Sequence, residues 1–382
     1  MAKLSQKQPL LILTHEFFPK RGGIATFTEE MAKAAHKLGY EVEIWAPLIH
    51  SDKKEPIPDW PFKIRWIPLK GTQNLSCQFK MARQIIKNRQ RFRRSIVYLP
   101  EPGPVLAMGY LHFFKAFKPA QLLITFHGTE ILRFASRPIA RFLVSKLIKK
   151  ADTITTPSLF SNKLLCKHFP SSRKKTRITS CALRTNIQNF PTEKKSTSDK
   201  IIILTVGRLH PRKGHTHIIN ALNRLPTNLQ KQVEYWIVGP GRKSNYTRDL
   251  KRSADQADFQ IRFFGKTTDE ELSNFYGDAD IFAMTSINHR KSVEGFGLVY
   301  LEASAFALPI IAHDVGGASE AVLHKKTGLL VSPEKPKALT EAFYQLITEK
   351  ELRSQLGTNG IHWAKHHSWE DSAKTLLEST SS

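Results

Sequence analysis

The sequence predicts two successive α/β domains, each built on a doubly wound parallel sheet. Short β-rich apolar runs alternate with longer helix-like segments, which is the pattern of parallel sheets covered by helices. The 382 residues exceed one ordinary core and suit two domains of roughly 150–200 residues each. The polar segment Pro191–Lys200 has no apolar periodicity and is typical of a linker. We therefore expect one domain over 1–195 and another over 200–367.

Each of the two predicted domains contains a series of alternating strands and helices, and each series includes five candidate strands. Those of the first series are Pro9–Thr14, Glu41–Trp45, Ile96–Leu99, Gln121–Thr125 and Thr153–Thr156. Helices predicted between them include Ile24–Leu38, Ser76–Arg93 and Pro138–Lys150. Strands of the second series are Ile201–Val206, Val233–Val238, Ile261–Phe264, Asp280–Met284 and Pro309–Ala312. Ligands bind at the carboxyl ends of strands in such sheets, so we expect both domains to face a central cleft.

Composition and cysteine use favour a cytoplasmic protein. No apolar run approaches the roughly 18 residues that span a bilayer. The apolar stretch Pro9–Thr14 is too short for a secretory signal. Cys77, Cys166 and Cys181 show neither paired nor metal-type spacing, which predicts reduced thiols.

The net charge of +25 is concentrated in the first half of the chain. Residues 1–199 hold 35 Lys and Arg against 13 Asp and Glu, whereas the remainder holds 23 against 20. This asymmetry favours an anionic partner for the first domain. The alternatives are a solvated lysine-rich surface and a basic nucleic-acid-binding protein, although no known nucleic-acid-binding module is present.

The second series opens with a candidate phosphate loop. The strand ending at Val206 leads into Gly207–Gly214, in which Arg208 and Lys213 flank a Pro-containing turn before a helix. A strand–loop–helix junction with cations beside a helix N-terminus suits a phosphate. The alternative is an ordinary turn with solvated basic residues. No Walker A spacing is present.

Two glutamates bracket a Gly-Phe-Gly turn further along the chain. Glu294 is expected in a loop, and Glu302 within the apolar helix that follows. Because they are eight residues apart, they cannot share one proton, but they can present acceptors along a polyhydroxylated ligand. The alternative is one capping and one buried, satisfied glutamate.

Two weaker signals lie in the first series. Gly22 and Gly23 form a glycine turn that opens a helix after the first strand. His127 follows the strand Gln121–Thr125 and falls at the carboxyl edge of the sheet. Plain turn chemistry and a structural histidine are the alternatives.

Taken together, these elements resemble the retaining glycosyltransferases of family 4, which have the GT-B fold of two Rossmann-like domains. The elements occur in the family's order over nearly the whole chain: GG at 22–23, FHG at 126–128, GRLHPRKG at 207–214, DADIFAMTS at 278–286, VEGFGLVYLEA at 293–303 and DVGGASEAV at 314–322. The segment His366–Glu370 resembles the family's terminal crossing, which implies that a helix at about 368–382 returns to the first domain.

The resemblance implies a donor site in the second domain. It places Arg208 and Lys213 on the donor pyrophosphate and Glu302 on the ribose hydroxyls. Glu294 accepts hydrogen bonds from the sugar with help from the backbone of the turn, whose residues are Gly295, Phe296, Gly297 and Leu298. In the first domain, it places His127 beside the transferred sugar and Gly22 and Gly23 on the phosphate and acceptor side.

The implied chemistry is transfer of a hexose with retention of configuration. No carboxylate nucleophile stands among these positions, so we expect front-face substitution, with cations in place of a metal and no cofactor. Thr285 and Ser286 replace the common Pro-Ser, and the loop Ile287–Val293 is long. The long loop resembles that of phosphatidylinositol mannosyltransferase-like enzymes, and the chain as a whole is also similar to lipopolysaccharide and polysaccharide glycosyltransferases. The long loop favours GDP-mannose as the donor, with a UDP-hexose as the alternative donor. The alternative function is that of a nucleotide-sugar epimerase on the same fold.

A basic first domain suits an anionic acceptor surface. Arg133–Lys150 and Lys80–Arg94 mix basic with apolar residues. We expect a glycan or lipid-linked acceptor, peripheral contact at the cytoplasmic face of an inner membrane, and no nucleic acid. The alternative is that the apolar residues simply face the domain core.

Overall fold

The chain folds into two compact units. The computed structural model describes residues 8–19, 22–48, 57–69, 74–187 and 199–378. One unit comprises Met1–Cys181 together with Ser368–Ser382, and the other comprises Ala182–His367. The first unit is therefore discontinuous in sequence. Residues 191–198 of the predicted linker lie outside the described residues.

A seven-stranded parallel sheet in the order β3-β2-β1-β4-β5-β6-β7 forms the centre of the first unit. Its strands are β1 (Leu10–Leu13), β2 (Val42–Pro47), β3 (Lys63–Ile67), β4 (Ile96–Leu99), β5 (Gln121–Thr125), β6 (Thr153–Thr156) and β7 (Thr176–Ile178). Leu10 pairs with both Val42 and Ile96, which fixes β1 between β2 and β4. The strands β3 and β7 at the two edges were not predicted.

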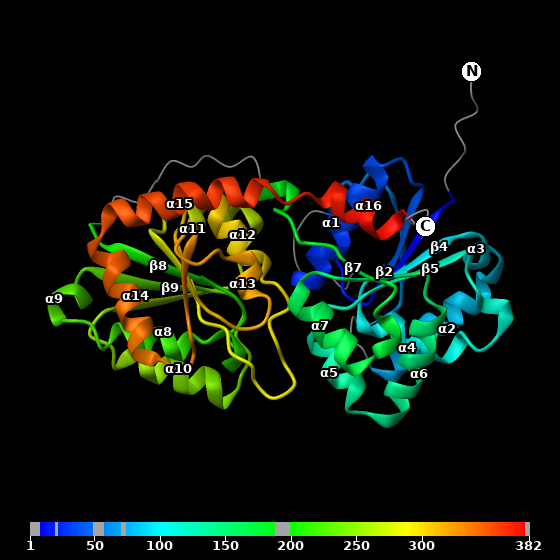
Figure 1. Cartoon of the computed structure of the whole chain (residues 1–382), viewed down its shortest axis with the longest axis horizontal. Helices are drawn as coiled ribbons and strands as arrows, with labels where there is room; N and C mark the ends of the chain where they lie inside the picture. The colour runs from blue at the N-terminus through cyan, green and yellow to red at the C-terminus, as the bar shows by residue number, and fades with distance from the viewer. Residues whose placement is uncertain (1–7, 20–21, 49–56, 70–73, 188–198, 379–382) are drawn as a thin grey trace, which may run out of the picture. The chain divides into compact units, whose positions relative to one another are not determined.

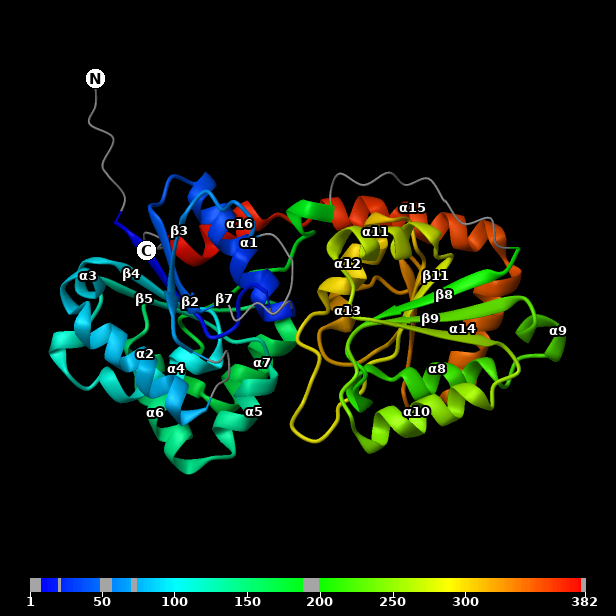
Figure 2. The same ribbon diagram turned by 180° about the vertical axis from the view of Figure 1, so that it is seen from behind.

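Helices cover both faces of this sheet. They are α1 (Gly23–Lys37), α2 (Leu75–Lys87), α3 (Arg89–Arg94), α4 (Pro102–Leu111), α5 (Thr129–Ala135), α6 (Pro138–Lys150), α7 (Leu159–His168) and α16 (Trp369–Leu377). Figures 1 and 2 show α1 and α16 on one face and α2, α4 and α6 on the other. Alternate residues of β1, such as Leu11 and Leu13, enter a core that also holds Met81 and Val144.

The predicted helix Ser76–Arg93 is wrong as one element, because α2 and α3 are separate. The backbone leaves the helical region at Asn88, with φ −110° and ψ 28°. The Asn88 side chain donates to the carbonyl of Gln84 at 2.8 Å. An asparagine side chain that hydrogen-bonds the preceding turn competes with helix continuation, which accounts for the break.

Helix α16 belongs to the first unit although the whole second unit precedes it in the chain. Trp369 packs edge-on against Phe27 of α1 with ring centroids 5.3 Å apart. Ser372 Oγ donates to the Ser180 carbonyl at 2.6 Å, and Lys37 pairs with Glu370 at 2.8 Å. Ser368 caps the helix by accepting from the amide of Asp371.

The second unit has a six-stranded parallel sheet in the order β10-β9-β8-β11-β12-β13. Its strands are β8 (Ile201–Val206), β9 (Val233–Val238), β10 (Gln260–Gly265), β11 (Ile281–Met284), β12 (Ile310–His313) and β13 (Gly328–Val331). All of them but β13 were predicted. The loops after β8 and β11 leave neighbouring strands at the same edge, which brings them close together.

Helices again cover both faces of the sheet. They are α8 (His215–Leu222), α9 (Thr227–Gln230), α10 (Asn245–Asp255), α11 (Asp269–Asp278), α12 (Leu298–Ala305), α13 (Ala318–Ala321), α14 (Pro336–Thr348) and α15 (Lys350–Lys365). Figures 1 and 2 show α8 and α10 on one face and α11, α12 and α15 on the other. Among the helices of the described ranges, none is long and apolar enough to cross a membrane.

Candidate active site

The predicted phosphate loop is fastened to the segment that follows β11. Lys213 ends a single 3-10 turn, and Gly214 then takes φ +75° before α8. A Cβ on Gly214 would lie 1.8 Å from the carbonyl oxygen of Thr285, so only glycine permits this approach. Thr285 Oγ1 donates to the Gly214 carbonyl at 2.8 Å, and the Ile287 amide donates to the Arg212 carbonyl at 2.8 Å. The loop and the segment leading to Glu294 therefore form one structure.

Glu294 lies at the centre of a buried polar cluster. Its Oε2 accepts from Arg212 Nη1 at 2.7 Å, from Lys213 Nζ at 2.9 Å and from Ser286 Oγ at 3.0 Å. Only 7% of Glu294 is exposed. A buried carboxylate needs such partners, because an unpaired charge is costly away from water.

Burial and the charges of this cluster shift the pKa values of Glu294 and Lys213. Burial alone raises the pKa of Glu294, but Lys213 and Arg212 outweigh it and lower the pKa to about 2. Burial lowers the pKa of Lys213, which Glu294 opposes, while Arg212 and Arg208 add to the lowering. Two close cations face one carboxylate, so the cluster keeps a net positive charge that suits an anionic ligand.

The predicted phosphate-binding cations are Arg208 and Lys213, and of these Lys213 forms an ion pair with Glu294. Arg208 is exposed on the same loop and lies close enough to affect the pKa of Lys213 and of His210. Sequence reasoning assigned no role to Arg212, which stands beside Lys213 and donates both to Glu294 and to the Val293 carbonyl. The signal was present, since three basic residues share this eight-residue loop.

The glycine turn after Glu294 delivers backbone amides at the start of α12. Gly297, at φ +93°, is the N-cap of this helix. Gly317 comes so close that a Cβ there would lie 2.1 Å from the Gly295 carbonyl oxygen. The Phe296 side chain is buried and its ring lies 6.1 Å from that of His367. Phe296 therefore offers its backbone, rather than its ring, to any ligand at this turn.

Glu302 lies in a second cluster that the sequence did not reveal. Its Oε1 accepts from Arg184 Nε at 2.7 Å, and its Oε2 accepts from the Tyr276 hydroxyl at 2.9 Å. Arg184 Nη1 also reaches Asp269 at 2.9 Å. Burial opposes the charge of Arg184, but Glu302 and Asp269 raise its pKa above the ordinary value. Arg184 is 118 residues from Glu302, so no local motif signals the pair.

In the first unit, His127 lies where the sequence predicted, just after β5. Its Nε2 is 2.8 Å from the Pro100 carbonyl oxygen, and its ring packs edge-on against Phe27 with centroids 5.0 Å apart. Phe27 belongs to α1, the helix that Gly22 caps and Gly23 begins. A Cβ on Gly22 or Gly23 would have no described atom within 4 Å. No described residue therefore fills the space beside these glycines, and His127 lies beside α1.

Sequence reasoning missed a buried pair at the same edge of the first sheet. Glu101 Oε1 accepts from the His15 amide at 2.8 Å and lies 3.4 Å from His15 Nδ1. Its Oε2 accepts from the Gly103 amide at 2.9 Å. Burial raises the pKa of Glu101 to about 8 and lowers that of His15 to about 4. Burial thus favours the uncharged form of both groups, and the pair joins the ends of β1 and β4.

The donor atoms for a metal are not gathered anywhere in the described ranges. Across those residues, no group of three or more His, Cys, Asp or Glu side chains could hold a metal ion. Cys77, Cys166 and Cys181 are free thiols.

Two protein families match consecutive parts of the chain. The model for Glycosyltransferase Family 4 matches residues 21–186, and the model for Glycosyl transferases group 1 matches residues 186–363. Together they run from the glycine turn of the first unit to the end of the second. Both families are of glycosyltransferases, so neither an epimerase nor a nucleic-acid-binding protein is favoured.

Known relatives match over nearly the full length or over about half of it. A GDP-mannose-dependent alpha-(1-6)-phosphatidylinositol monomannoside mannosyltransferase from Mycolicibacterium smegmatis is 26% identical, over 97% of each chain. A D-inositol 3-phosphate glycosyltransferase from Corynebacterium urealyticum is 34% identical over 46% of this chain and 42% of its own.

Solved structures share the fold. Sucrose-phosphate synthase from Thermosynechococcus elongatus superposes with a TM-score of 0.77 at 20% identity, over 96% of each chain. A glycosyltransferase involved in lipopolysaccharide biosynthesis gives 0.73 at 16% identity, over 97% of this chain and all of its own. The GT-B architecture of two Rossmann-like domains is thus confirmed, and the chain belongs to the glycosyltransferases that carry a family 4 domain followed by a group 1 domain.

Proposed function

We propose that this glycosyltransferase moves a hexose, with retention of configuration, from a nucleotide-sugar donor to a glycolipid or glycan acceptor. GDP-mannose is favoured over a UDP-hexose as the donor. Three full-length relatives are GDP-mannose-dependent mannosyltransferases that act on phosphatidylinositol monomannosides, which supports this choice and a lipid-linked acceptor.

The observation that carries the proposal is the cluster of Arg212, Lys213 and Glu294. Its excess positive charge suits the diphosphate of a nucleotide sugar, and exposed Arg208 adds a further cation on the same loop. Fixed cations stabilise the negative charge that develops on the departing diphosphate. Because the chain itself supplies this positive charge, we propose that transfer needs no metal.

The low pKa of Glu294 favours a holding role over a nucleophilic one. A carboxylate with a pKa of about 2 is a weak base and already accepts three hydrogen bonds on Oε2. Its second oxygen suits a donor-sugar hydroxyl. In the proposed step, the acceptor oxygen bonds to the anomeric carbon on the side from which the diphosphate departs. The bond between the anomeric carbon and the diphosphate oxygen breaks on that same face, so configuration is retained. The acceptor proton passes to the leaving diphosphate.

Binding of the donor is the direct test of the proposal. We would measure thermal unfolding with GDP-mannose, UDP-glucose and ADP-glucose. A ligand at 100 times its dissociation constant stabilises the fold by about 2.7 kcal/mol, and we expect this only for GDP-mannose. The anomeric configuration of the product, read by NMR, tests retention. No stabilisation by any of the three nucleotide sugars would contradict the proposal.

Removal of divalent metals is expected to leave the reaction rate within about twofold of the rate before removal. The reason is that cationic side chains stabilise the charge of the diphosphate. The rate would be measured before and after dialysis against EDTA. Restoration of a lost activity by manganese would refute metal-independent transfer.

We also assign Glu302 to the ribose hydroxyls of the donor. Each carboxylate oxygen has two acceptor sites, and Arg184 and Tyr276 take only one on each. Glu302→Gln should therefore weaken nucleotide binding about tenfold, or about 1.4 kcal/mol, with little change in kcat. Calorimetry with GDP measures the affinity.

The matched control for that variant is Asp269→Asn. Asp269 contacts Arg184 but not Glu302, so nucleotide affinity should stay within about twofold of wild type. Equal GDP binding by wild type and Glu302→Gln would remove Glu302 from the ribose site.

Finally, we propose that the enzyme works in the cytoplasm, in peripheral contact with an anionic membrane. Residues 1–199 carry 35 basic against 13 acidic side chains, and each Lys or Arg near an anionic leaflet attracts it. The lipid acceptors named for the relatives are consistent with such contact.

A further inference from the structure

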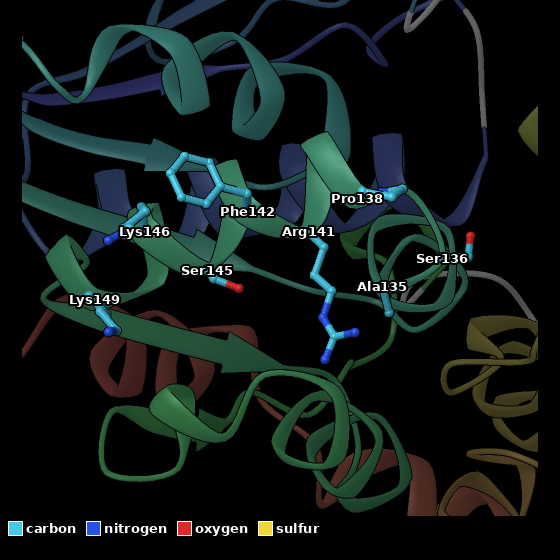
Figure 3. A pocket seen from close by; sticks show the side chains of 8 residues that line it. All are labelled: Ala135, Ser136, Pro138, Arg141, Phe142, Ser145, Lys146 and Lys149. Atoms are coloured by element: carbon cyan, nitrogen blue, oxygen red, sulfur yellow. The ribbon is translucent and has the colours of Figure 1, made fainter.

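A cavity of about 440 Å³ opens on the first unit where α5 ends and α6 begins. Its lining comprises Ala135, Ser136, Pro138, Arg141, Phe142, Ser145, Lys146 and Lys149. Figure 3 shows these side chains. The lining residues include three cations and two hydroxyls but no carboxylate, so the cavity is built for an anion.

Within the described ranges, no carboxylate neutralises the cationic groups of the cavity. None of Arg141, Lys146 and Lys149 forms an ion pair with a described carboxylate. Arg141, Ser145 and Lys149 follow one another at four-residue intervals, which places them along one face of α6. Burial lowers the pKa of nearby His168, and the charges of Lys167 and Arg141 lower it further.

Exposed apolar side chains border the cavity. Helix α6 packs on the domain core through its buried residues Leu143, Val144, Leu147 and Ile148. Ile139 and Phe142 point away from that core and are 72% and 55% exposed. The alternative in which all apolar residues of this helix face the core is therefore wrong for these two.

An aromatic pair joins α6 to the end of α4. The rings of Phe113 and Phe142 stack with centroids 6.3 Å apart, and Phe113 is itself half exposed. Lys146 Nζ lies 5.5 Å from the centre of Phe142, and Lys150 Nζ lies 6.0 Å from that of Phe113. Aromatic rings flanked by lysines match the boundary between the head groups and acyl chains of a bilayer.

We propose that this cavity seats the phosphate of an anionic phospholipid while Phe113, Ile139 and Phe142 enter the acyl boundary. The cations and hydroxyls recognise the phosphate. The neighbouring apolar side chains require an apolar partner, which a bilayer supplies and a soluble phosphorylated glycan does not. This site deepens the proposed membrane contact and rests on it.

Vesicle sedimentation tests the site. We would compare phosphatidylcholine vesicles with vesicles that also contain phosphatidylglycerol, at low and high salt. Wild type should bind only the anionic vesicles, and less at high salt, because the Debye length falls from about 10 Å at 0.1 M to about 3 Å at 1 M. The double variant Arg141→Gln, Lys149→Gln should bind about thirtyfold more weakly, the effect expected for two cations at an anionic leaflet.

A control variant with the same loss of charge distinguishes binding by the cavity from general electrostatic attraction to the membrane. Arg93→Gln, Arg94→Gln removes two exposed cations of α3 and should bind within about twofold of wild type. Equal losses in both double variants would overturn the cavity while leaving the proposed membrane contact standing. Wild type that ignores anionic vesicles at low salt would overturn the membrane contact itself.

A soluble probe distinguishes the source of the phosphate. Glycerol phosphate should compete with vesicles only weakly, since it lacks the acyl chains that Phe142 and Ile139 contact. Ile139→Ser, Phe142→Ser should therefore also weaken vesicle binding at least tenfold. Undiminished vesicle binding by this variant, with tight binding of glycerol phosphate, would overturn the lipid assignment. Donor-induced stabilisation should be unchanged in every variant, which excludes unfolding.

Discussion

Replacing Glu294 with alanine is expected to reduce kcat about a hundredfold while leaving GDP affinity equal or higher. The variant loses a charged acceptor for the donor sugar, and such hydrogen bonds are worth about 1.5–3 kcal/mol. It also releases Arg212 and Lys213 from their carboxylate, so the diphosphate meets more positive charge. Steady-state kinetics and calorimetry with GDP measure the two effects separately.

The matched control is Ser286→Ala, which removes a neutral hydroxyl donor to the Glu294 carboxylate. A neutral hydrogen bond contributes about 0.5–1.5 kcal/mol, so we expect kcat to fall by no more than about tenfold. If Glu294→Ala retained wild-type kcat, the carboxylate would have a purely structural role.

Lys213→Ala should have the second largest effect, with transfer at least tenfold slower and GDP bound more weakly. The substitution removes a charge-assisted contact worth about 1.5–3 kcal/mol to the diphosphate. It also leaves Glu294 buried with one cation instead of two, so the fold should be less stable at neutral pH.

The pH dependence of that destabilisation has a defined direction. The pKa of Glu294 is about 2 in the folded protein, below the ordinary value of 4.5. Its contribution to stability is therefore present above about pH 4.5 and is lost as the pH falls toward 2. Urea unfolding should show wild type and Lys213→Ala far apart at pH 7 and closer at pH 3.

Arg208→Ala supplies the comparison for Lys213. Arg208 is exposed, so its removal should weaken GDP binding without lowering stability at pH 7. Full activity in Lys213→Ala would exclude this lysine from the donor site.

The interior strands of both sheets could be predicted from sequence, whereas three of the four edge strands were missed. Central strands such as β4, β5 and β8 are short apolar runs, and their predicted and observed bounds coincide. The missed strands β3, β7 and β13 lie at sheet edges, and most residues of β3 and β7 are only partly buried. The strands β3 and β7 contain charged residues such as Lys63, Arg65 and Arg177. They therefore lack the apolar run by which a buried strand is recognised.

The same distinction applies to the candidate site. Lys213 and Glu294 lie within motifs, and the structure brings them together at 2.9 Å. Arg184 and Tyr276 reach Glu302 from outside any motif, because the folded chain rather than local spacing makes these contacts. The buried pair of His15 and Glu101 was missed for the same reason, since β1 and β4 adjoin only in the sheet.

The return of α16 to the first unit constrains the order of folding during synthesis. The ribosome must translate residues 182–367 before Trp369 can pack on Phe27, which takes roughly 10–40 s at about 5–20 residues per second. Until then, the face of α1 on which this helix packs leaves Phe27 accessible to solvent and to chaperones. A recombinant first domain should therefore include residues 368–378, joined through a linker, if it is to stay in solution alone.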